Sequence, residues 1–146
     1  MEHTHSIIII KNENGEYLQY FDTRWDSYLF PNCKLTNENH KQLINQYLIQ
    51  NFNFLANEKY TIEYVMDKVH TKFSESAKVN KEYHHYFYNI KLDNIPNFMQ
   101  NPTFSANDKT FKWFSLTKLE EDKRIQQVNS DIVEFIKTID EEILKK

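Results

Sequence analysis

Glycine is almost absent from this chain of 146 residues, since Gly15 is the only one. An ordinary composition, with a glycine share of about 7%, would supply roughly ten. Glycine-rich phosphate loops and dinucleotide-binding turns need several glycines, because a bare backbone is what lets the chain approach the phosphates closely. The sequence therefore argues against both kinds of nucleotide site.

Disulfides, a basic surface and long apolar runs are missing as well. Cys33 is the single cysteine, which excludes an internal disulfide, and the formal net charge of -3 gives no basic face for nucleic acid. The four isoleucines at 7–10 form a run too short to cross a bilayer or to act as a signal sequence. We expect one soluble, cytoplasmic domain over residues 1–146, with no nucleic acid or membrane partner.

The first third of the chain begins with a pattern typical of paired strands. Residues 5–12 are rich in isoleucine, Asn14 and Gly15 form a turn signal, and apolar residues alternate again in 16–22. This pattern predicts a β-hairpin.

A short strand and a helix are expected next. The strand covers residues 27–30 and stops at Pro31, and a polar loop follows through Asn37. Residues 38–52 then change to the helical period. The apolar stripe of this helix is made by Leu43, Ile44, Tyr47, Leu48 and Phe52.

Two further strands are expected at residues 60–69 and 82–92. Alternation divides the aromatic residues of the second strand between two faces, with Tyr83, His85 and Phe87 on one and His84, Tyr86 and Tyr88 on the other. Because both faces are aromatic, we expect this strand to be central and covered on both sides.

The last third is expected to begin with an irregular segment and to end in helices. Residues 93–108 hold two prolines and four asparagines, and a short strand follows at 110–115. A helix is expected after Ser115, and a second one is expected to be capped by Asn129 or Ser130. The order of strands and helices predicts an α+β or sandwiched α/β/α domain.

This order resembles the Nudix superfamily, whose members are α/β/α sandwiches of roughly this length. The family has a strand that ends in a W-x-F-P-G-G-like turn, and its box reads G-x5-E-x7-R-E-U-x-E-E-x-G-U, with U apolar. Here "YLFPNCKLTNE" is similar to the strand and turn, with Tyr28, Phe30 and Pro31 at the aromatic, apolar and proline positions. The resemblance covers residues 6–143 and implies a Nudix-like α/β/α sandwich with a mixed β-sheet between helices.

The apolar residues of the expected helix select one register for the box. With Gln46 at the arginine, the family's buried positions are filled by Leu43, Ile44, Leu48, Phe52 and Phe54. A shift of one residue would put Asn45 and Asn53 into the core.

In that register the resemblance implies the loss of most of the box carboxylates. Tyr47 stands at the glutamate that follows the arginine, and Gln50 and Asn51 stand at the E-E pair that binds the divalent metal in active members. Glu38 matches the first glutamate if the preceding loop is one residue shorter than usual.

The chemistry of these replacements argues against catalysis. Mg²⁺ is a hard cation that prefers carboxylate oxygens, and amides lack their charge. The phenol of Tyr47 is a poor ligand at neutral pH, although its hydroxyl can donate a hydrogen bond to a phosphate. We therefore expect no metal or other cofactor. An active member would be a Mg²⁺-dependent pyrophosphohydrolase that relies on Glu38, with further carboxylates drawn from Glu63, Asp67 or Glu75.

Aromatic and amide side chains are the candidates for ligand binding, because a base-sized ligand in a Nudix-like cleft would be stacked by aromatic rings. The candidate residues are Trp25, Tyr28, Tyr47, Gln50, Asn51 and Tyr86. Gln50 and Asn51 also fit ordinary exposed helix positions. The charged residues Asp22, Arg24 and Asp26 fit a solvated loop.

Zinc and a reactive thiol are weaker hypotheses. No spacing of the six histidines and Cys33 matches a structural zinc site, and His84 and His85 must point to opposite faces of a strand. Cys33 has only Lys34 beside it in the sequence to lower its pKa.

Three functions stay open at this point. Intact box spacing with missing carboxylates favours a catalytically degenerate domain, a pseudoenzyme that binds a nucleotide or another phosphorylated small molecule as a sensor or scaffold. The alternatives are a divergent hydrolase of nucleoside diphosphate derivatives and a protein-interaction subunit. The resemblance also implies a homodimer, and the composition rich in Asn, Lys and Ile suits a bacterial protein.

Overall fold

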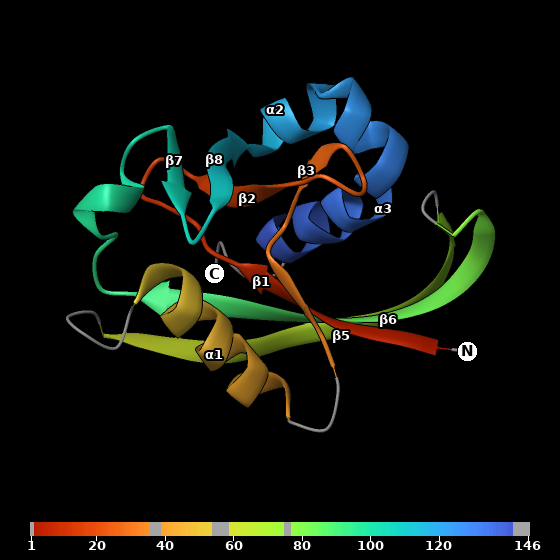
Figure 1. Cartoon of the computed structure of the whole chain (residues 1–146), viewed down its shortest axis with the longest axis horizontal. Helices are drawn as coiled ribbons and strands as arrows, with labels where there is room; N and C mark the ends of the chain where they lie inside the picture. The colour runs from red at the N-terminus through yellow and green to blue at the C-terminus, as the bar shows by residue number, and fades with distance from the viewer. Residues whose placement is uncertain (1, 36–38, 54–58, 75–76, 142–146) are drawn as a thin grey trace.

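The structure is a computed structural model that describes residues 2–35, 39–53, 59–74 and 77–141. In these ranges two four-stranded sheets form, in the orders β4-β1-β6-β5 and β3-β2-β8-β7 (Figure 1). The strands are β1 (Glu2–Ile9), β2 (Glu16–Asp22), β3 (Ser27–Leu29), β4 (Asn32–Lys34), β5 (Tyr60–Ser74), β6 (Val79–Leu92), β7 (Thr103–Ala106) and β8 (Lys109–Ser115). The helices are α1 (His40–Phe52), α2 (Leu116–Glu121) and α3 (Lys123–Ile139), with the short 3-10 helix η2 (Asn97–Met99).

β1 lies at the centre of the fold and not in a hairpin. It pairs in parallel with β6 and antiparallel with β4, whereas β2 pairs with β3 and β8 in the other sheet. The hairpin expected from residues 5–12 and 16–22 is therefore wrong, and these segments meet through an isolated bridge between Lys11 and Tyr17. Alternate isoleucines of residues 7–10 enter two different cores, and a two-stranded hairpin would leave one of those faces in water.

The turn that was expected after β1 is confirmed. The side-chain oxygen of Asn12 accepts hydrogen bonds from the backbone N–H groups of Asn14 (3.1 Å) and Glu16 (2.9 Å). Gly15 has a φ of 76°, in the left-handed region that glycine adopts without strain. The turn leads the chain from one sheet to the other.

The chain crosses back between the sheets at Pro31. Residues 32–34 form β4, where Cys33 pairs with Ser6 of β1, so the polar loop expected from this point is wrong for these three residues. β4 lies at the edge of its sheet and pairs with β1 through the backbone, so the polar side chains of Asn32 and Lys34 are compatible with a strand.

The helix expected over residues 38–52 is confirmed as α1 in its described part. Asn39 caps it, because its side chain accepts from the backbone N–H of Gln42 at 2.8 Å. Ile44 and Leu48 lie fully buried on its inner face.

β6 lies between β1 and β5, which confirms that this strand is central. Its side chains alternate as predicted. Tyr83 and His85 line a cavity on one face, and Tyr86 packs against the ring of His40 of α1 on the other.

The end of the chain differs from the sequence-based expectation in two places. The segment 93–108 is not wholly irregular, since it contains η2 and β7. α3 already begins after Asp122, whose side chain accepts from the backbone N–H of Ile125 at 2.9 Å, and the helix that was expected to start at Asn129 or Ser130 is its second part. Asn129 instead interrupts the helix, with φ of -143° and ψ of 21°. The cap of α2 is the expected one, Ser115.

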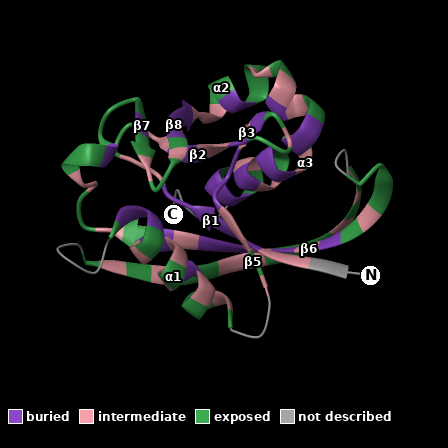
Figure 2. Ribbon diagram, in the orientation of Figure 1, coloured by how far each residue is buried: buried purple, intermediate pink, exposed green. Residues whose placement is uncertain are grey.

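The helices lie on opposite sides of the sheets. Ile44 and Leu48 of α1 close one core, and Ile132 and Ile136 of α3 close the other. Figure 1 shows α1 on one side of the molecule and α2 and α3 on the other, and the buried residues in Figure 2 lie between them. This is the α/β/α sandwich with a mixed β-sheet that the resemblance implied. Within the described ranges, no helix has both the length and the apolar character needed to cross a membrane.

Candidate functional site

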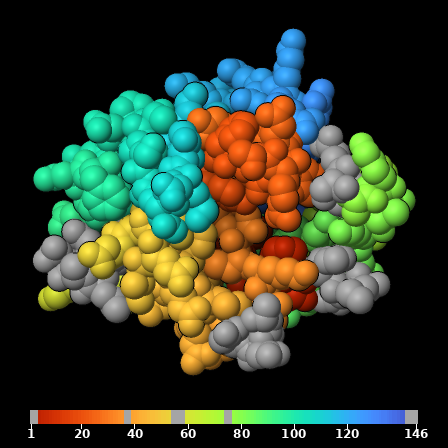
Figure 3. Space-filling view, viewed as in Figure 1, coloured from red at the N-terminus to blue at the C-terminus, as the bar shows by residue number. Residues whose placement is uncertain are grey.

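A cavity of about 410 Å³ opens between the two sheets, and its volume lies in the usual range for small-molecule sites. Both sheets and α3 contribute to its walls. Figure 3 shows the hollow, with the red atoms of β1 at its floor and the orange atoms of the β2–β4 region at its rim. The described lining residues include His5, Tyr20, Asp22, Arg24, Trp25, Asn32, Lys34, Lys72, Lys81, Tyr83, His85 and Asn129.

The lining of the cavity is basic although the chain as a whole is acidic. Among the described residues, Arg24 and three lysines line it, against one carboxylate, Asp22. The formal net charge of the chain is -3, so positive charge is concentrated here. Arg24 and Lys34 are exposed at the rim and form no side-chain hydrogen bond or ion pair with another described residue. A concave site of this charge attracts an anionic ligand.

Asp22 shapes the turn that presents Arg24 and Trp25 to the cavity. One carboxylate oxygen accepts from the backbone N–H groups of Arg24 (2.9 Å) and Trp25 (3.1 Å). The other accepts from the hydroxyl of Tyr20 at 2.8 Å, and burial together with this carboxylate raises the pKa of Tyr20. Asp22 is buried, so its interpretation as part of a solvated loop is wrong.

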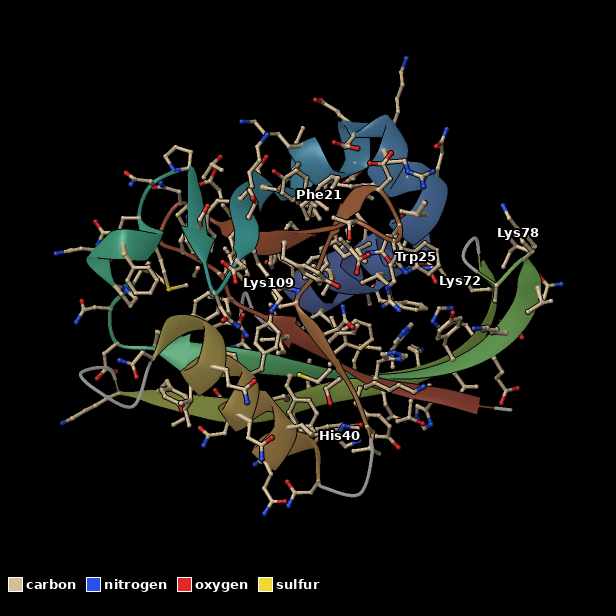
Figure 4. The ribbon with its side chains drawn as sticks, in the orientation of Figure 1. Phe21, Trp25, His40, Lys72, Lys78 and Lys109 are labelled. Carbon is tan, nitrogen blue, oxygen red and sulfur yellow. The ribbon has the colours of Figure 1, made fainter. Side chains whose placement is uncertain are left out.

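Lys72 connects the turn to α3. Its ammonium donates to the side-chain oxygens of Asn129 (3.1 Å) and Asp131 (3.2 Å) and lies 5.6 Å from the centre of the Trp25 ring. Figure 4 shows Trp25 and Lys72 side by side at this end of the molecule. The break of α3 at Asn129 therefore coincides with the wall of the cavity.

A chain of polar contacts runs from α3 to the cavity through two histidines. Asp131 Oδ2 lies 2.9 Å from His70 Nδ1, and His70 Nε2 lies 2.6 Å from His85 Nδ1. Burial and the neighbouring His70 lower the pKa of His85 to about 3, which keeps its ring neutral. Burial alone would raise the pKa of Asp131, but the close contacts with His70 and with the charge of Lys72 outweigh it and lower this pKa to about 2.

Two of the box residues, Tyr47 and Asn51, lie together at the end of α1. Asn51 Oδ1 accepts from the ammonium of Lys109 at 2.9 Å and from the amide of Asn107 at 3.3 Å. The same ammonium lies 5.7 Å from the centre of the Tyr47 ring. Gln50 is exposed. Figure 4 shows Lys109 above α1.

The described donors at these positions do not fit a magnesium ion. Burial raises the pKa of Tyr47 and keeps its hydroxyl neutral. The oxygen of Asn51 is also neutral and already accepts from a cation, Lys109. Mg²⁺ needs carboxylate ligands and would be repelled by the ammonium. Glu38 lies outside the described residues.

Tyr28 and Tyr86 lie outside the cavity, and Trp25 is the candidate that lines it. Tyr28 packs against the rings of Phe21 and Phe114, each with a centre-to-centre distance of 5.3 Å. Tyr86 packs against the ring of His40 on the face of β6 opposite the cavity, with a centre-to-centre distance of 4.2 Å. The structure therefore does not bring the six candidate ligand residues to one place.

The carboxylates proposed for a divergent hydrolase do not converge on the cavity. Glu63 is exposed and pairs with Lys91 at 3.4 Å. Asp67 lies 2.6 Å from His84 Nε2 on the outer face of the sheet. Glu75 lies outside the described residues. Among the described residues, no group of three or more His, Cys, Asp or Glu side chains is arranged to hold a metal ion.

Cys33 is half-buried near Lys109 and is not an activated thiol. Burial raises its pKa to about 12, an effect that the charge of Lys109 offsets only in part. The structure thus gives no support to a reactive cysteine.

Reasoning from the sequence missed the basic lining and the histidine chain. Lys34, Lys72 and Lys81 come from three different strands, and no local pattern distinguishes them from other lysines. Alternation along β6 places His85 on the same face as Tyr83, but the register with β5 that brings His70 to it is a tertiary feature.

No protein-family model matches the chain, and no curated protein matches it. Its fold is similar to that of the MutT protein from Methanosarcina mazei Go1, with a TM-score of 0.59 and 14% identity over 97% of this chain and 94% of that one. It is also similar to a NUDIX hydrolase from Nitrosomonas europaea, with a TM-score of 0.51 and 11% identity over 86% of this chain and 80% of that one.

A third similar structure is a bifunctional NMN adenylyltransferase/ADP ribose pyrophosphatase from Francisella tularensis. The TM-score is 0.54 and the identity 16% over 97% of this chain, which spans 41% of that enzyme. The chain therefore has a Nudix-like fold, as the resemblance implied. At these identities the likeness concerns the fold alone.

Proposed function

We propose that this chain binds a nucleotide or another phosphorylated small molecule in the cavity between its sheets, as a sensor or scaffold. The observation that supports this most is the basic lining of a cavity of about 410 Å³ in an acidic chain. Trp25 and Tyr83 add aromatic surface for a base or another ring. A phosphate at the rim would meet Arg24 and Lys34.

The proposal includes the loss of metal-dependent hydrolysis. Its support is the ammonium of Lys109 on the oxygen of Asn51, at a position where the resemblance implies a metal-binding carboxylate. One of the similar structures is described as a complex with AMP and a Mn ion, from the bifunctional enzyme of Francisella tularensis. The present chain offers neutral oxygens in place of such ligands.

Calorimetric titration tests the binding. AMP, ADP and phenyl phosphate are titrated into the protein in EDTA, at about pH 8, where a phosphate monoester with a second pKa near 6 is a dianion. We expect binding in EDTA and no gain from Mg²⁺. Replacing both rim cations in Arg24→Gln/Lys34→Gln should weaken it about tenfold or more, because each charge-assisted hydrogen bond contributes about 1.5–3 kcal/mol.

The matched control is Lys118→Gln, which removes an exposed lysine on α2 that is not among the lining residues. It should bind as the wild type does. Absence of binding by all three probes, or equal affinity in the double variant, would contradict the proposal. Release of phosphate from ADP in the presence of Mg²⁺ would assign a hydrolase instead.

The proposal extends to a cytoplasmic homodimer. Its support is the exposed apolar surface of the β5–β6 hairpin, where Val69, Phe73 and Val79 are each more than half exposed, at 55%, 51% and 52%. Figure 1 shows this hairpin projecting from the body of the molecule. Sedimentation equilibrium measures the state directly, and a monomer at all concentrations would contradict a homodimer.

A further inference from the structure

His85 is linked to the half-buried carboxylate of Asp131 through His70, by one hydrogen bond and one close ion-pair contact. Asp131 Oδ2 lies 2.9 Å from His70 Nδ1, and His70 Nε2 lies 2.6 Å from His85 Nδ1. His85 lines the cavity, whereas His70 and Asp131 stand behind it. Because His70 engages Nδ1 of His85, Nε2 is the ring nitrogen that remains for a ligand.

The charges of Lys72 and Asp131 determine which ring nitrogens of His70 and His85 carry a proton. The ammonium of Lys72 donates to Asp131 Oδ1 at 3.2 Å, which favours the ionised carboxylate. An ionised carboxylate has only lone pairs to offer, so at 2.9 Å it favours the tautomer of His70 that carries its proton on Nδ1. A neutral His70 then accepts at Nε2, and His85 must donate from Nδ1. The Nε2 atom of His85 is therefore an unprotonated acceptor.

We propose that Asp131 and His70 hold His85 as a fixed hydrogen-bond acceptor in the cavity, so that the ligand must present an N–H or O–H group beside its anionic group. This inference rests on the proposed function. Asp131 and His70 act as positioning residues, and His85 is the residue that contacts the ligand.

The inference narrows the class of ligand. A nucleoside phosphate carries donors on its sugar and, for adenine, on its exocyclic amine. A phenyl phosphate dianion has the ring and the charge but no donor at about pH 8. A site built around a buried acceptor discriminates against a ligand that leaves it unpaired.

Nitrogen NMR of the protein labelled with ¹⁵N-histidine tests the proton positions at about pH 8, above the ordinary titration range of histidine. We expect His85 to be protonated on Nδ1 and unprotonated on Nε2, and His70 to be neutral with its proton on Nδ1. AMP should shift the Nε2 resonance of His85 upfield as it donates a hydrogen bond, and phenyl phosphate should leave that resonance in place.

The variant Asp131→Asn gives a signature that a merely structural role would not produce. The ammonium of Lys72 can only donate, so the new amide must turn its oxygen to Lys72 and its NH₂ group to His70. In both histidines the ring proton then moves from Nδ1 to Nε2, and His85 becomes a donor at Nε2. We expect the preference for AMP over phenyl phosphate to fall about tenfold, the loss of about one hydrogen bond. The control Asp67→Asn alters the carboxylate next to His84 on the outer face and should leave His85 unchanged.

The outcomes separate this inference from the proposed function. If AMP and phenyl phosphate both fail to bind, both proposals fall. If AMP binds and depends on Arg24 and Lys34 but the Nε2 resonance does not move, only the inference is overturned. A protonated Nε2 of His85, or a doubly protonated His70, in the wild type would also overturn it. These measurements do not require that Asp131→Asn folds.

Discussion

The ammonium of Lys109 lies 2.9 Å from the side-chain oxygen of Asn51. Asn51 is buried near the end of α1, and Lys109 begins β8, so the contact joins the helix to the β7–β8 hairpin. The amide nitrogen of Asn51 donates in turn to the backbone oxygen of Tyr47 at 2.9 Å. A cation thus lies on the helix face where the resemblance implies a metal ion, and the chain itself supplies it.

Lys109→Met should destabilise the protein. The variant keeps most of the apolar stem but removes a hydrogen bond from a charged donor, and Asn51 keeps the longer bond from Asn107 at 3.3 Å. We expect the free energy of unfolding in urea to fall by about 1.5–3 kcal/mol. Lys118→Met, at an exposed position of α2, is the control and should change it by less than about 0.5 kcal/mol. Equal effects of the two variants would show that the contact is energetically neutral.

Removing the hydroxyl of Tyr47 and removing that of Tyr20 should change the free energy of unfolding in opposite directions. The hydroxyl of Tyr47 is buried without a hydrogen-bond partner among the described residues, whereas that of Tyr20 donates to Asp22 at 2.8 Å. Tyr47→Phe relieves an unsatisfied group and should raise the free energy of unfolding by about 1 kcal/mol. Tyr20→Phe removes a bond to a carboxylate and should lower it by about 2 kcal/mol. Chemical denaturation compares the two, and losses of equal size would contradict the difference in their surroundings.

His85 should make the protein less stable in mild acid. Its pKa is about 3 in the folded state, against about 6.5 in an unfolded chain, so between these values the unfolded state holds a proton that the folded state lacks. The free energy of unfolding should therefore have its full value above about pH 6.5 and fall by about 1.4 kcal/mol per pH unit below that pH.

The change His85→Gln should flatten this slope between about pH 6 and pH 5, where the carboxylates are still ionised. His84→Gln, on the opposite face of β6, serves as the matched control and should keep the slope. Denaturation curves at several pH values give the measurement. A slope that survives in His85→Gln would assign the acid sensitivity to another group.

Cys33 should resist alkylation in the folded protein. Burial raises its pKa to about 12, so the thiolate is scarce at about pH 8. Mass spectrometry after iodoacetamide should show little modification under native conditions and complete modification in urea. Because Cys33 is the only cysteine, the mass added by iodoacetamide reports the modification of this residue alone. Rapid labelling of the folded chain would mean that the thiol is accessible and activated.

Local patterns were reliable where a short segment determines its own structure. The helical period predicts α1, and the alternation over residues 82–92 predicts the two faces of β6. The turn at Asn12–Gly15 was also recognised, but not its partners. A turn signal reports that the chain reverses, and it does not report which strands then pair.

The candidate site was predicted only in part. Trp25 lines the cavity, while Tyr28 and Tyr86 lie elsewhere because the neighbours of an aromatic residue depend on the sheet packed against it. Lys34, Lys72 and His85 carried no local signal. Each lies on a different strand, and sheet order brings them together.

The sequence by itself determined the register of α1 and the absence of carboxylates at positions 47, 50 and 51, because side-chain chemistry and the helical period are local properties. The tertiary structure decided that Lys109, 58 residues further along the chain, bonds to Asn51. It also decided that Asp131, His70 and His85 form one chain of polar contacts. Such contacts join distant segments, and they exist only once two sheets and three helices have closed their cores around them.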